Sequence, residues 1–430
     1  MLKKQAISIS LIILFVAAVG IFIGRTSATM VSAEGEAYED LKTFTEVLTK
    51  VKQNYVEEVK SKDLIYGAIK GMLNSLDPHS GFLTAEAYKE MGVDMKGEFG
   101  GLGIQIGIKD KILTVIAPIE DTPAYKAGIK AGDKIIKVNN ELTREMTIHD
   151  AVSKMRGAPK TSVTISILRE GWMETKDFTI VRDIIKIKSV KSKVIEGNIG
   201  YIKLSQFQEQ TAEDLSNALK KLNEEKVNAL ILDLRNNPGG LLGSAIDVSN
   251  KFLPKGKLVV FIKNKAGERT EYFTENESSF TQPMIVLVNQ GSASASEIVA
   301  GAMSDWKRAV ILGVQTFGKG SVQTVIPLSD GSGLRLTTAK YYTPKGTSIQ
   351  STGITPDIIV KLEAKNGAKE HPVVREIDLA RHLENEQIDS KPEETETAPF
   401  EVDEKDDIQL QRAIDILKTW DVLKNLPKAS

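Results

Sequence analysis

The feature that most constrains the fold is a series of continuous apolar segments, separated by helical sequence, that begins after about residue 193. ALILDLR (229–235), MIVLVN (284–289) and AVILGV (309–314) are apolar at successive positions, which is typical of strands buried on both faces. Segments with helical spacing, such as 211–225, lie between strands of this kind. This order indicates βαβ units with helices on the faces of the sheet, so we predict an α/β core.

The length of 430 residues exceeds what one hydrophobic core usually supports, so we expect two or three domains. Apolar residues recur at helical spacing before residue 95, and a β-rich unit with two helices follows. The segment 386–407 is acidic and poor in apolar residues, which is typical of a flexible linker. The expected organisation is a leader at 1–33, a helical N-terminal region at 34–95, a β-rich domain at 96–185, the α/β core at 186–362, and a C-terminal tail with the linker and a terminal helix at 363–430.

The N-terminus has the features of an export signal. Lys3 and Lys4 precede an apolar run at 6–24, and the small residues at 31–33 suit cleavage by a signal peptidase. The run is also long enough to span a bilayer, so a cleaved signal peptide and an uncleaved anchor are both open. In either case we expect a periplasmic or otherwise extracytoplasmic protein, either secreted or anchored to the cytoplasmic membrane by its N-terminus.

The composition excludes several classes of function. The chain has no cysteine, which excludes disulfides, a cysteine nucleophile and thiolate metal sites. Its 56 basic and 57 acidic residues give a formal net charge of −1, without the basic excess of a nucleic-acid-binding protein. We therefore expect no nucleic-acid partner.

The stretch NQGSASASEIVAGAM at 289–303 is the first candidate site. A buried strand enters a turn of small residues and then a helix, so a serine at this junction has an exposed Oγ. The N–H groups at the start of the helix could stabilise a tetrahedral oxyanion. The alternative is an ordinary helix N-cap formed by Ser296. The spacing alone does not choose among Ser292, Ser294 and Ser296 as the nucleophile.

The stretch TFGKGSVQ at 316–323 supplies a candidate base, Lys319, between two glycines. A neutral lysine can activate a serine if burial lowers its pKa, and the chain's four histidines all lie outside the α/β core. The alternative is a glycine-rich hairpin with a solvated lysine. A phosphate-binding loop is disfavoured, because Gly320 stands where such a loop has Ser or Thr and strand-like sequence follows.

Two glycine-rich loops complete the set of candidates. LDLRNNPGG (232–240) ends a buried strand, and a glycine N–H there could serve as a second oxyanion donor. GLGIQIG (101–107) could present N–H groups beside an exposed strand edge and bind the terminal carboxylate of a peptide. A plain turn and a purely structural β domain are the respective alternatives.

Taken together, these segments resemble the carboxyl-terminal processing, or tail-specific, peptidases. The resemblance covers about residues 40–360, and the family's markers occur in the family's order. They are LDPHSGFL (76–83), EFGGLGI (98–104), the PDZ-like DTPAYKAGIKAGDKIIKVN (121–139), LRNNPGG (234–240), GSASASE (291–297) and TFGKGSVQ (316–323). The resemblance implies an α/β, α+β multidomain fold: a crotonase/ClpP-like α/β protease core with an inserted PDZ-like β domain and a helical N-terminal region.

The resemblance also assigns roles within the core. It implies Ser294 as the nucleophile, Lys319 as its general base, and Gln323 as the residue that helps to hold the lysine. The oxyanion donors would be the N–H groups of Ala295 and Gly240. No metal or other cofactor is implied. For LDPHSGFL we expect only an Asp-Pro turn that orders the N-terminal helices.

The expected function is that of a serine endopeptidase that cleaves the C-terminal regions of exported proteins with apolar tails. The PDZ-like domain would bind the tail through Gly100, Gly101, Leu102, Gly103 and Ile104, and Arg156 would couple binding to the active site. A non-catalytic periplasmic scaffold or chaperone, and an acyl-transferring or ester-cleaving use of the same dyad, are the alternatives. The terminal helices at 37–73 and 408–424 would form a homodimer interface or pack on their own core.

Overall fold

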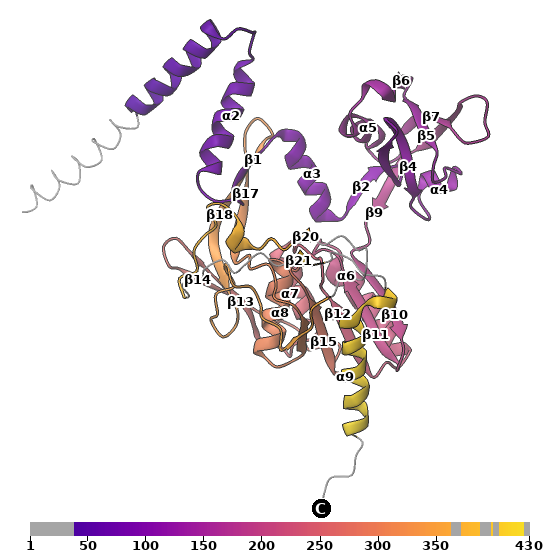
Figure 1. Ribbon diagram of the computed structural model, residues 1–430, viewed down its shortest axis with the longest axis vertical. Helices are drawn as coiled ribbons and strands as arrows, with labels where there is room; N and C mark the ends of the chain where they lie inside the picture. The colour runs from indigo at the N-terminus through magenta and orange to yellow at the C-terminus, as the bar shows by residue number, and fades with distance from the viewer. Residues whose placement is uncertain (1–37, 363–370, 388–396, 399–403, 425–430) are drawn as a thin grey trace, which may run out of the picture. The chain divides into compact units, whose positions relative to one another are not determined.

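The computed structural model describes residues 38–362, 371–387, 397–398 and 404–424 (Figure 1). The predicted signal segment at 1–33, with its apolar run at 6–24, lies outside the described residues, as do parts of the predicted C-terminal linker. Among the helices of the described part of the chain, none combines the length and the hydropathy that crossing a membrane requires. The chain divides after Ser75 into two compact units.

The predicted α/β core is confirmed as a six-stranded sheet of order β10-β11-β12-β15-β16-β19. Its first pair is antiparallel and the other four pairs are parallel. Because parallel strands end at the same edge, the segments that follow β12 and β15 come together there. The strands are β10 (Val190–Ile195), β11 (Ile199–Leu204), β12 (Ala229–Asp233), β15 (Met284–Val288), β16 (Val310–Gly313) and β19 (Ile358–Ile359).

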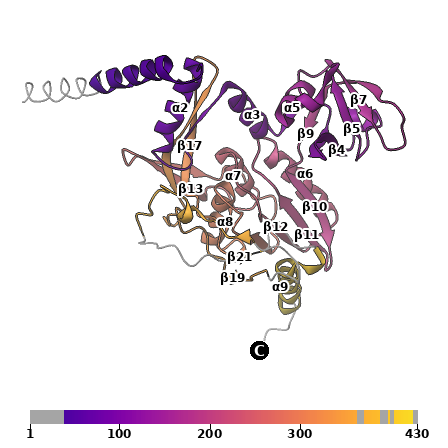
Figure 2. The same cartoon turned by 45° about the horizontal axis from the view of Figure 1, so that its top comes forward.

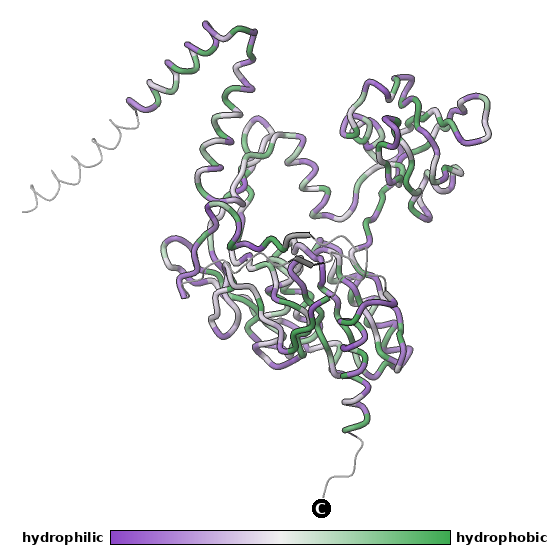
Figure 3. Tube along the Cα trace, in the orientation of Figure 1, coloured by the Kyte–Doolittle hydropathy of each residue, from purple (hydrophilic) through white to green (hydrophobic). Residues whose placement is uncertain are grey.

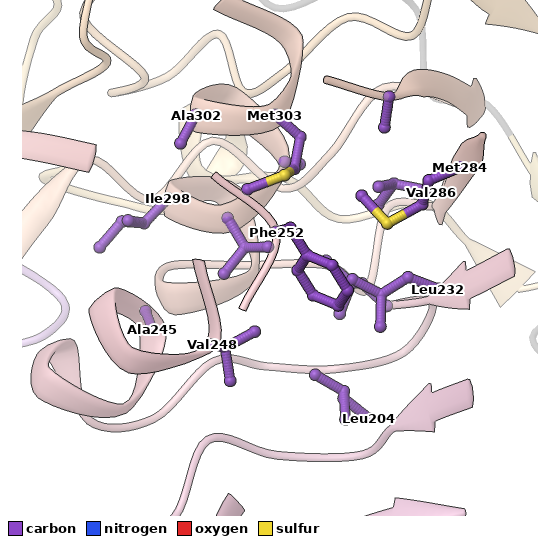
Figure 4. Packing of buried hydrophobic residues seen from close by; sticks show 14 of the residues in the cluster. Leu204, Leu232, Ala245, Val248, Phe252, Met284, Val286, Ile298, Ala302 and Met303 are labelled. Atoms are coloured by element: carbon purple, nitrogen blue, oxygen red, sulfur yellow. The ribbon is translucent and has the colours of Figure 1, made fainter. Parts of the chain in front are cut away.

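Helices cover both faces of this sheet, as its continuous apolar strands predict. On β12, Leu230 and Leu232 join a cluster with α6, α7 and α8, whereas Ala229 and Ile231 join a separate cluster with α9. Figure 4 shows Leu232 and Val286 of the strands against Phe252 beside the helices. The predicted terminal helix therefore packs on its own core. The helices are α6 (Thr211–Glu224), α7 (Leu242–Ser249), α8 (Ala295–Asp305) and α9 (Ile408–Lys424).

A second, antiparallel sheet contains the strand that follows the segment of Lys319. It has the order β1-β18-β13-β14, and β17 pairs with β18 in a hairpin. The apolar segment 257–264 lies in this sheet, because β13 pairs with β14 and β18. The region predicted as helical at 34–95 also contributes β1 to it. The elements are β1 (Gly81–Leu83), α3 (Ala85–Lys96), β13 (Leu258–Asn264), β14 (Arg269–Phe273), β17 (Ser321–Pro327) and β18 (Gly333–Tyr342), with the short pair β20 (His371–Pro372) and β21 (Thr397–Ala398) elsewhere.

The PDZ-like domain has its own sheet (Figure 2). A separate cluster of buried apolar side chains forms its core. The sheet has the order β3-β4-β5-β7-β8, which leaves β3 as an edge strand, and β6 pairs with β5. A two-stranded ribbon of β2 and β9 carries the chain into and out of the domain. The elements are β2 (Glu98–Gly101), β3 (Ile104–Lys109), β4 (Ile112–Pro118), α4 (Pro123–Lys126), β5 (Lys134–Val138), β6 (Glu141–Leu142), α5 (Ile148–Met155), β7 (Ser162–Leu168), β8 (Lys176–Val181) and β9 (Asp183–Lys186).

The N-terminal unit consists of a helix at 38–54 and α2 (Ser61–Asn74). Hydrophobic and hydrophilic segments alternate along the first helix (Figure 3). In α2 only Leu73 is buried. The exposed large apolar side chains of this unit are Tyr38, Leu41, Phe44, Val47, Tyr55, Val56, Ile65 and Met72.

Candidate active site

Ser294 lies at the junction between the loop after β15 and the first residue of α8. It is the N-cap of this helix, with φ 53° and ψ −113°. A residue other than glycine at positive φ is strained by about 1–3 kcal/mol, and such strain is concentrated at functional sites. The turn therefore presents Ser294 where an exposed nucleophile is expected, ahead of the positive end of a helix dipole.

The three candidate serines differ in their surroundings. Ser292 and Ser296 are completely buried, and their hydroxyls donate to the Leu234 and Asn237 carbonyls at 2.8 and 2.9 Å. Ser294 is partly exposed. Of the three, only Ser294 can contact a substrate while the turn stays intact. The repeated Ser-Ala spacing in the sequence does not reveal this difference in exposure.

The Asn-Asn-Pro-Gly-Gly loop after β12 lies directly against this turn. A Cβ on Gly239 would lie 2.8 Å from the Ser294 Cβ, and one on Gly240 would lie 2.1 Å from the Phe207 carbonyl oxygen, so only glycine fits at either position. The N–H of Gly239 donates to the Asn237 side chain. Among the described residues, the N–H groups of Ala295 and Gly240 have no acceptor, which leaves both available to an oxyanion.

Glu297 connects the turn of Ser294 with the loop at 316–320 that carries Lys319, called the lysine loop below. Its carboxylate is completely buried and accepts four hydrogen bonds. The donors are the N–H of Ser294 (2.8 Å), the hydroxyl of Thr316 (2.6 Å), and the N–H groups of Gly318 (2.7 Å) and Lys319 (3.0 Å). Burial raises the pKa of Glu297 to about 7. The four hydrogen bonds favour the ionised form and therefore act in the opposite direction. Glu297 was not among the site residues predicted from the sequence, although it ends the GSASASE segment.

Lys319 is largely withdrawn from solvent. Burial lowers the pKa of its amine below the usual range, and the charge of Arg335 acts in the same direction. The carboxylates of Glu376, Glu297 and Asp77 oppose the shift. The net effect is a lowered pKa, so the Lys319 amine loses its proton at a lower pH than free lysine does. A general base must be in this neutral state.

Gln323 lies on β17, but its contacts differ from those implied by the resemblance. Its side-chain amide donates to the hydroxyls of Ser321 at 3.0 Å and Thr337 at 3.4 Å. No hydrogen bond joins Gln323 to Lys319 among the described residues. Gln323 therefore does not hold the amine of Lys319 in this structure. It is linked to Asp77 through the Thr337 hydroxyl, which contacts both side chains.

LDPHSGFL was expected to be a structural turn only, and that expectation is too narrow. Asp77 accepts from the backbone N–H and the hydroxyl of Ser80 and from the hydroxyl of Thr337, which also contacts Gln323. His79 Nε2 lies 2.7 Å from the Glu376 carboxylate. The motif thus connects to the surroundings of Lys319, and its Asp-Pro-His-Ser signal was visible in the sequence.

The predicted C-terminal tail at 363–430 contains a residue that lies beside the lysine loop, Glu376. Glu376 is completely buried, and the Gln350 amide donates to its carboxylate at 3.0 Å. The backbone N–H of Glu376 donates to the carbonyl of Phe317 in the lysine loop. No local signal in the sequence distinguishes Glu376 from the exposed acidic residues around it.

The predicted peptide-binding residues of the PDZ-like domain separate into two groups. Gly100 and Gly101 lie in β2, which pairs with β9 in a two-stranded ribbon outside the main sheet of the domain, so they are not part of edge strand β3. Leu102 and Gly103 form the loop before edge strand β3, which begins at Ile104, and they accept hydrogen bonds from Ala124 and Ile119 through their carbonyls. Arg156 ends α5, and its guanidinium lies 4.5 Å from the centre of the Phe99 ring on β2.

Comparisons with known proteins agree with this architecture. The model of peptidase family S41 matches residues 198–360, a PDZ-domain model matches 114–169, and the model described as the activating protease CtpB N-terminal domain matches 23–87. The three matched regions follow one another along the chain in the same order as the N-terminal helices, the PDZ-like domain and the α/β core.

Similar proteins extend the match to almost the whole chain. A carboxy-terminal-processing protease of Bartonella bacilliformis is 44% identical over 95% of this chain and 95% of its own length. The carboxy-terminal processing protease CtpA of Bacillus subtilis is 37% identical over 83% of this chain and 75% of its own. Among solved structures, a photosystem II D1 C-terminal processing protease is 31% identical and covers 74% of this chain and 92% of its own, with a TM-score of 0.43. The chain therefore belongs to peptidase family S41, as a serine peptidase of the carboxy-terminal-processing group with a PDZ domain.

Proposed function

We propose that Ser294 is the nucleophile and Lys319 the general base with which this peptidase cleaves the C-terminal regions of exported proteins. One observation carries the assignment of the nucleophile: of the three serines in the turn, Ser294 alone is accessible, and it stands at a strained helix N-terminus. The lowered pKa of Lys319 supports its role as the base. Family membership favours this catalytic function over a scaffold that only holds tails.

Acylation proceeds in two steps in this proposal. The Ser294 Oγ forms a bond to the scissile carbonyl carbon while its proton moves to the neutral amine of Lys319. The N–H groups of Ala295 and Gly240 donate to the resulting oxyanion. The carbon–nitrogen bond then breaks, and the lysine ammonium returns the proton to the leaving amine.

Deacylation repeats the same steps with water. Lys319 takes a proton from a water molecule, whose oxygen attacks the acyl carbon. The bond between the carbon and the Ser294 Oγ then breaks, and Oγ recovers the proton from Lys319. Glu297 holds the backbone of both residues throughout, because its carboxylate accepts from the N–H of Ser294 and of Lys319.

The PDZ domain supports recognition of protein substrates through apolar C-terminal tails. Edge strand β3 has a free side on which a peptide adds as a further strand, with its carboxylate at the Leu102–Gly103 loop. Arg156 packs on Phe99 of β2, the strand through which the chain enters the domain. A tail that binds beside α5 would therefore shift β2 through this contact. Replacement of Arg156 by Ala should abolish stimulation by a tail peptide and leave basal cleavage in place.

We also propose an extracytoplasmic location and a homodimer. The location rests on the leader at 1–33, of which the apolar run at 6–24 would act as a signal or an anchor. The dimer rests on the apolar side chains that the N-terminal unit exposes, including Leu41 and Val47 at 63% and 55% exposure.

The test uses the full chain, purified in mild detergent, and an unfolded protein substrate with an apolar C-terminus. Wild type is compared with Ser294→Ala, Ser296→Ala, Lys319→Ala and Lys319→Arg by mass spectrometry of the products. Among the described residues, the Ser296 hydroxyl bonds only to the Asn237 carbonyl, so Ser296→Ala serves as the matched control. We expect cleavage by wild type and Ser296→Ala alone. Cleavage by Ser294→Ala, or its loss in Ser296→Ala with the fold intact, would reassign the nucleophile.

A further inference from the structure

Tyr341 has a hydroxyl that the proposed mechanism does not use. The residue lies on β18 with 2% of its surface exposed, and its hydroxyl has no hydrogen-bond partner of normal geometry among the described residues. Leaving a buried hydroxyl without a partner costs about 1–3 kcal/mol relative to satisfying it. A buried hydroxyl kept at this cost requires an explanation, such as a bond that forms only during function.

The surroundings of the hydroxyl are those of the proposed active site. Tyr341 packs in the same buried cluster as Ala295, the residue that follows Ser294. Its hydroxyl lies near the Ser294 side chain, which lowers the pKa of the phenol against the effect of burial. The backbone N–H of Tyr341 donates to the carbonyl of Gly320 at 2.9 Å, which attaches β18 to the residue after Lys319. Tyr341 thus connects by its backbone to the lysine loop and by its side chain to the serine.

The hydroxyl stays protonated at any working pH. Burial holds the pKa of Tyr341 well above its usual range, and the negative charges of Glu297 and Glu376 act in the same direction. A phenol of this kind donates a hydrogen bond and does not act as a base.

We propose that Tyr341 is a further catalytic residue, whose hydroxyl donates a hydrogen bond to the Ser294 Oγ as charge develops on that atom. This inference rests on the proposed role of Ser294 as nucleophile. When Lys319 removes the serine proton, the Tyr341 hydroxyl stabilises the electron-rich Oγ. When the acyl-enzyme is hydrolysed, the same bond stabilises Oγ as the leaving atom. Tyr341 keeps its own proton in both steps, so the proton balance between Ser294 and Lys319 is unchanged.

The strand provides a matched control in the next residue. Successive side chains of a strand point to opposite faces. The Tyr342 ring accordingly stacks on Phe261, with centroids 5.0 Å apart, and the Lys263 amine lies 5.0 Å from its centre. Tyr342→Phe removes the same atom from the same strand, away from Ser294.

The experiment compares full-length wild type, Ser294→Ala, Tyr341→Phe and Tyr342→Phe for kcat, KM and melting temperature with the tail-bearing protein substrate. We expect Tyr341→Phe to lower kcat by about 10- to 100-fold, the worth of a hydrogen bond to a charged atom. KM should stay within about twofold. The melting temperature of Tyr341→Phe should be unchanged or higher, because the substitution removes a buried hydroxyl that has no hydrogen-bond partner of normal geometry in the described part of the chain. Tyr342→Phe should cleave like wild type.

Two results would overturn the inference. One is a kcat of Tyr341→Phe within twofold of that of Tyr342→Phe. The other is a lowered melting temperature in Tyr341→Phe together with the lost activity, which would make the hydroxyl a structural group. Failure of the proposed function looks different: Ser294→Ala would then cleave as fast as wild type, whatever the tyrosine variants do.

Discussion

The α/β core buries its apolar side chains, whereas the N-terminal unit exposes most of its large ones. In the core, both faces of the sheet are covered by helices of the same chain, and α9 returns from the far end of the sequence to cover the second face. In the N-terminal unit, α2 buries only Leu73, while Leu41 and Phe44 of the preceding helix are exposed at 63% and 43%.

The difference shows where the stability and the chemistry of this protein lie. A core that satisfies its own apolar and polar groups can hold a strained serine and a buried lysine, because the surrounding packing supplies the energy. Helices with exposed apolar faces gain little stability by themselves, because most helical stability in proteins comes from tertiary packing. Substitutions in the core should therefore have large effects, and substitutions in the N-terminal unit small effects on the fold.

The largest effect is expected at Lys319. Lys319→Arg keeps the positive charge, but a guanidinium does not lose its proton in proteins, so it cannot act as a base. We expect kcat to fall by about 10⁴-fold or more, as for other residues that act as a catalytic unit. Single-turnover cleavage measures this loss, and circular dichroism checks the fold. Retention of a tenth of the wild-type rate by this variant would remove Lys319 from the role of base.

The second effect is a steep dependence of rate on pH. The pKa of Lys319 is lowered, so the amine becomes neutral below the pH at which free lysine does. The rate should rise with pH by about tenfold per unit and reach a plateau below the ordinary pKa of lysine. Below about pH 7 the slope should steepen, because Glu297, with its pKa raised to about 7, also takes up a proton. A profile that is flat between mildly acidic and alkaline pH would contradict both assignments.

The third effect tests the role of Glu297, whose carboxylate bridges the turn of Ser294 and the lysine loop. Glu297→Gln keeps the shape of the side chain but turns an N–H₂ group toward at least one of the donors that the carboxylate accepts. We expect a loss of stability of about 1–3 kcal/mol and a fall in kcat of about 100-fold. Urea unfolding and initial rates measure the two effects. An unchanged kcat in a destabilised variant would show that Glu297 supports the fold alone.

The fourth effect tests how far α9 belongs to the core. Ile414 is 5% exposed and lies in the cluster that covers the second face of the sheet. Ile414→Ala should lower the free energy of unfolding by about 2–4 kcal/mol. Trp420→Ala on the same helix, at a side chain that is 52% exposed, should change it by about 0.5 kcal/mol or less. Equal effects of the two variants would show that α9 is not part of the core.

The smallest effect on the fold is expected in the N-terminal unit. Replacing Leu41, Phe44 and Val47 together by Ser should change the free energy of unfolding by about 0.5 kcal/mol or less per substitution. If these side chains form the dimer interface, the same variant should be monomeric by sedimentation at concentrations where wild type is dimeric. A wild-type dimer that survives the triple substitution would place the interface elsewhere.

The sequence by itself determined the parts of this protein that depend on local pattern. Continuous apolar segments such as 229–235 predicted the buried strands, and small residues at 291–296 predicted a strand-to-helix turn with an exposed serine. Gly239 and Gly240 were visible as an unusual pair, and the structure explains them by contacts that leave no room for a Cβ. These features are local because strand periodicity and backbone conformation are encoded in neighbouring residues.

Only the tertiary structure decided which of those residues meet. It separated Ser294 from its buried neighbours, placed Glu297 between the serine turn and the lysine loop, and brought Glu376 to Lys319 from a segment expected to be a tail. It also buried Tyr341 near the serine and stacked the adjacent Tyr342 on Phe261. Burial and ionisation depend on groups that are far apart in the chain, and no local pattern carries that information.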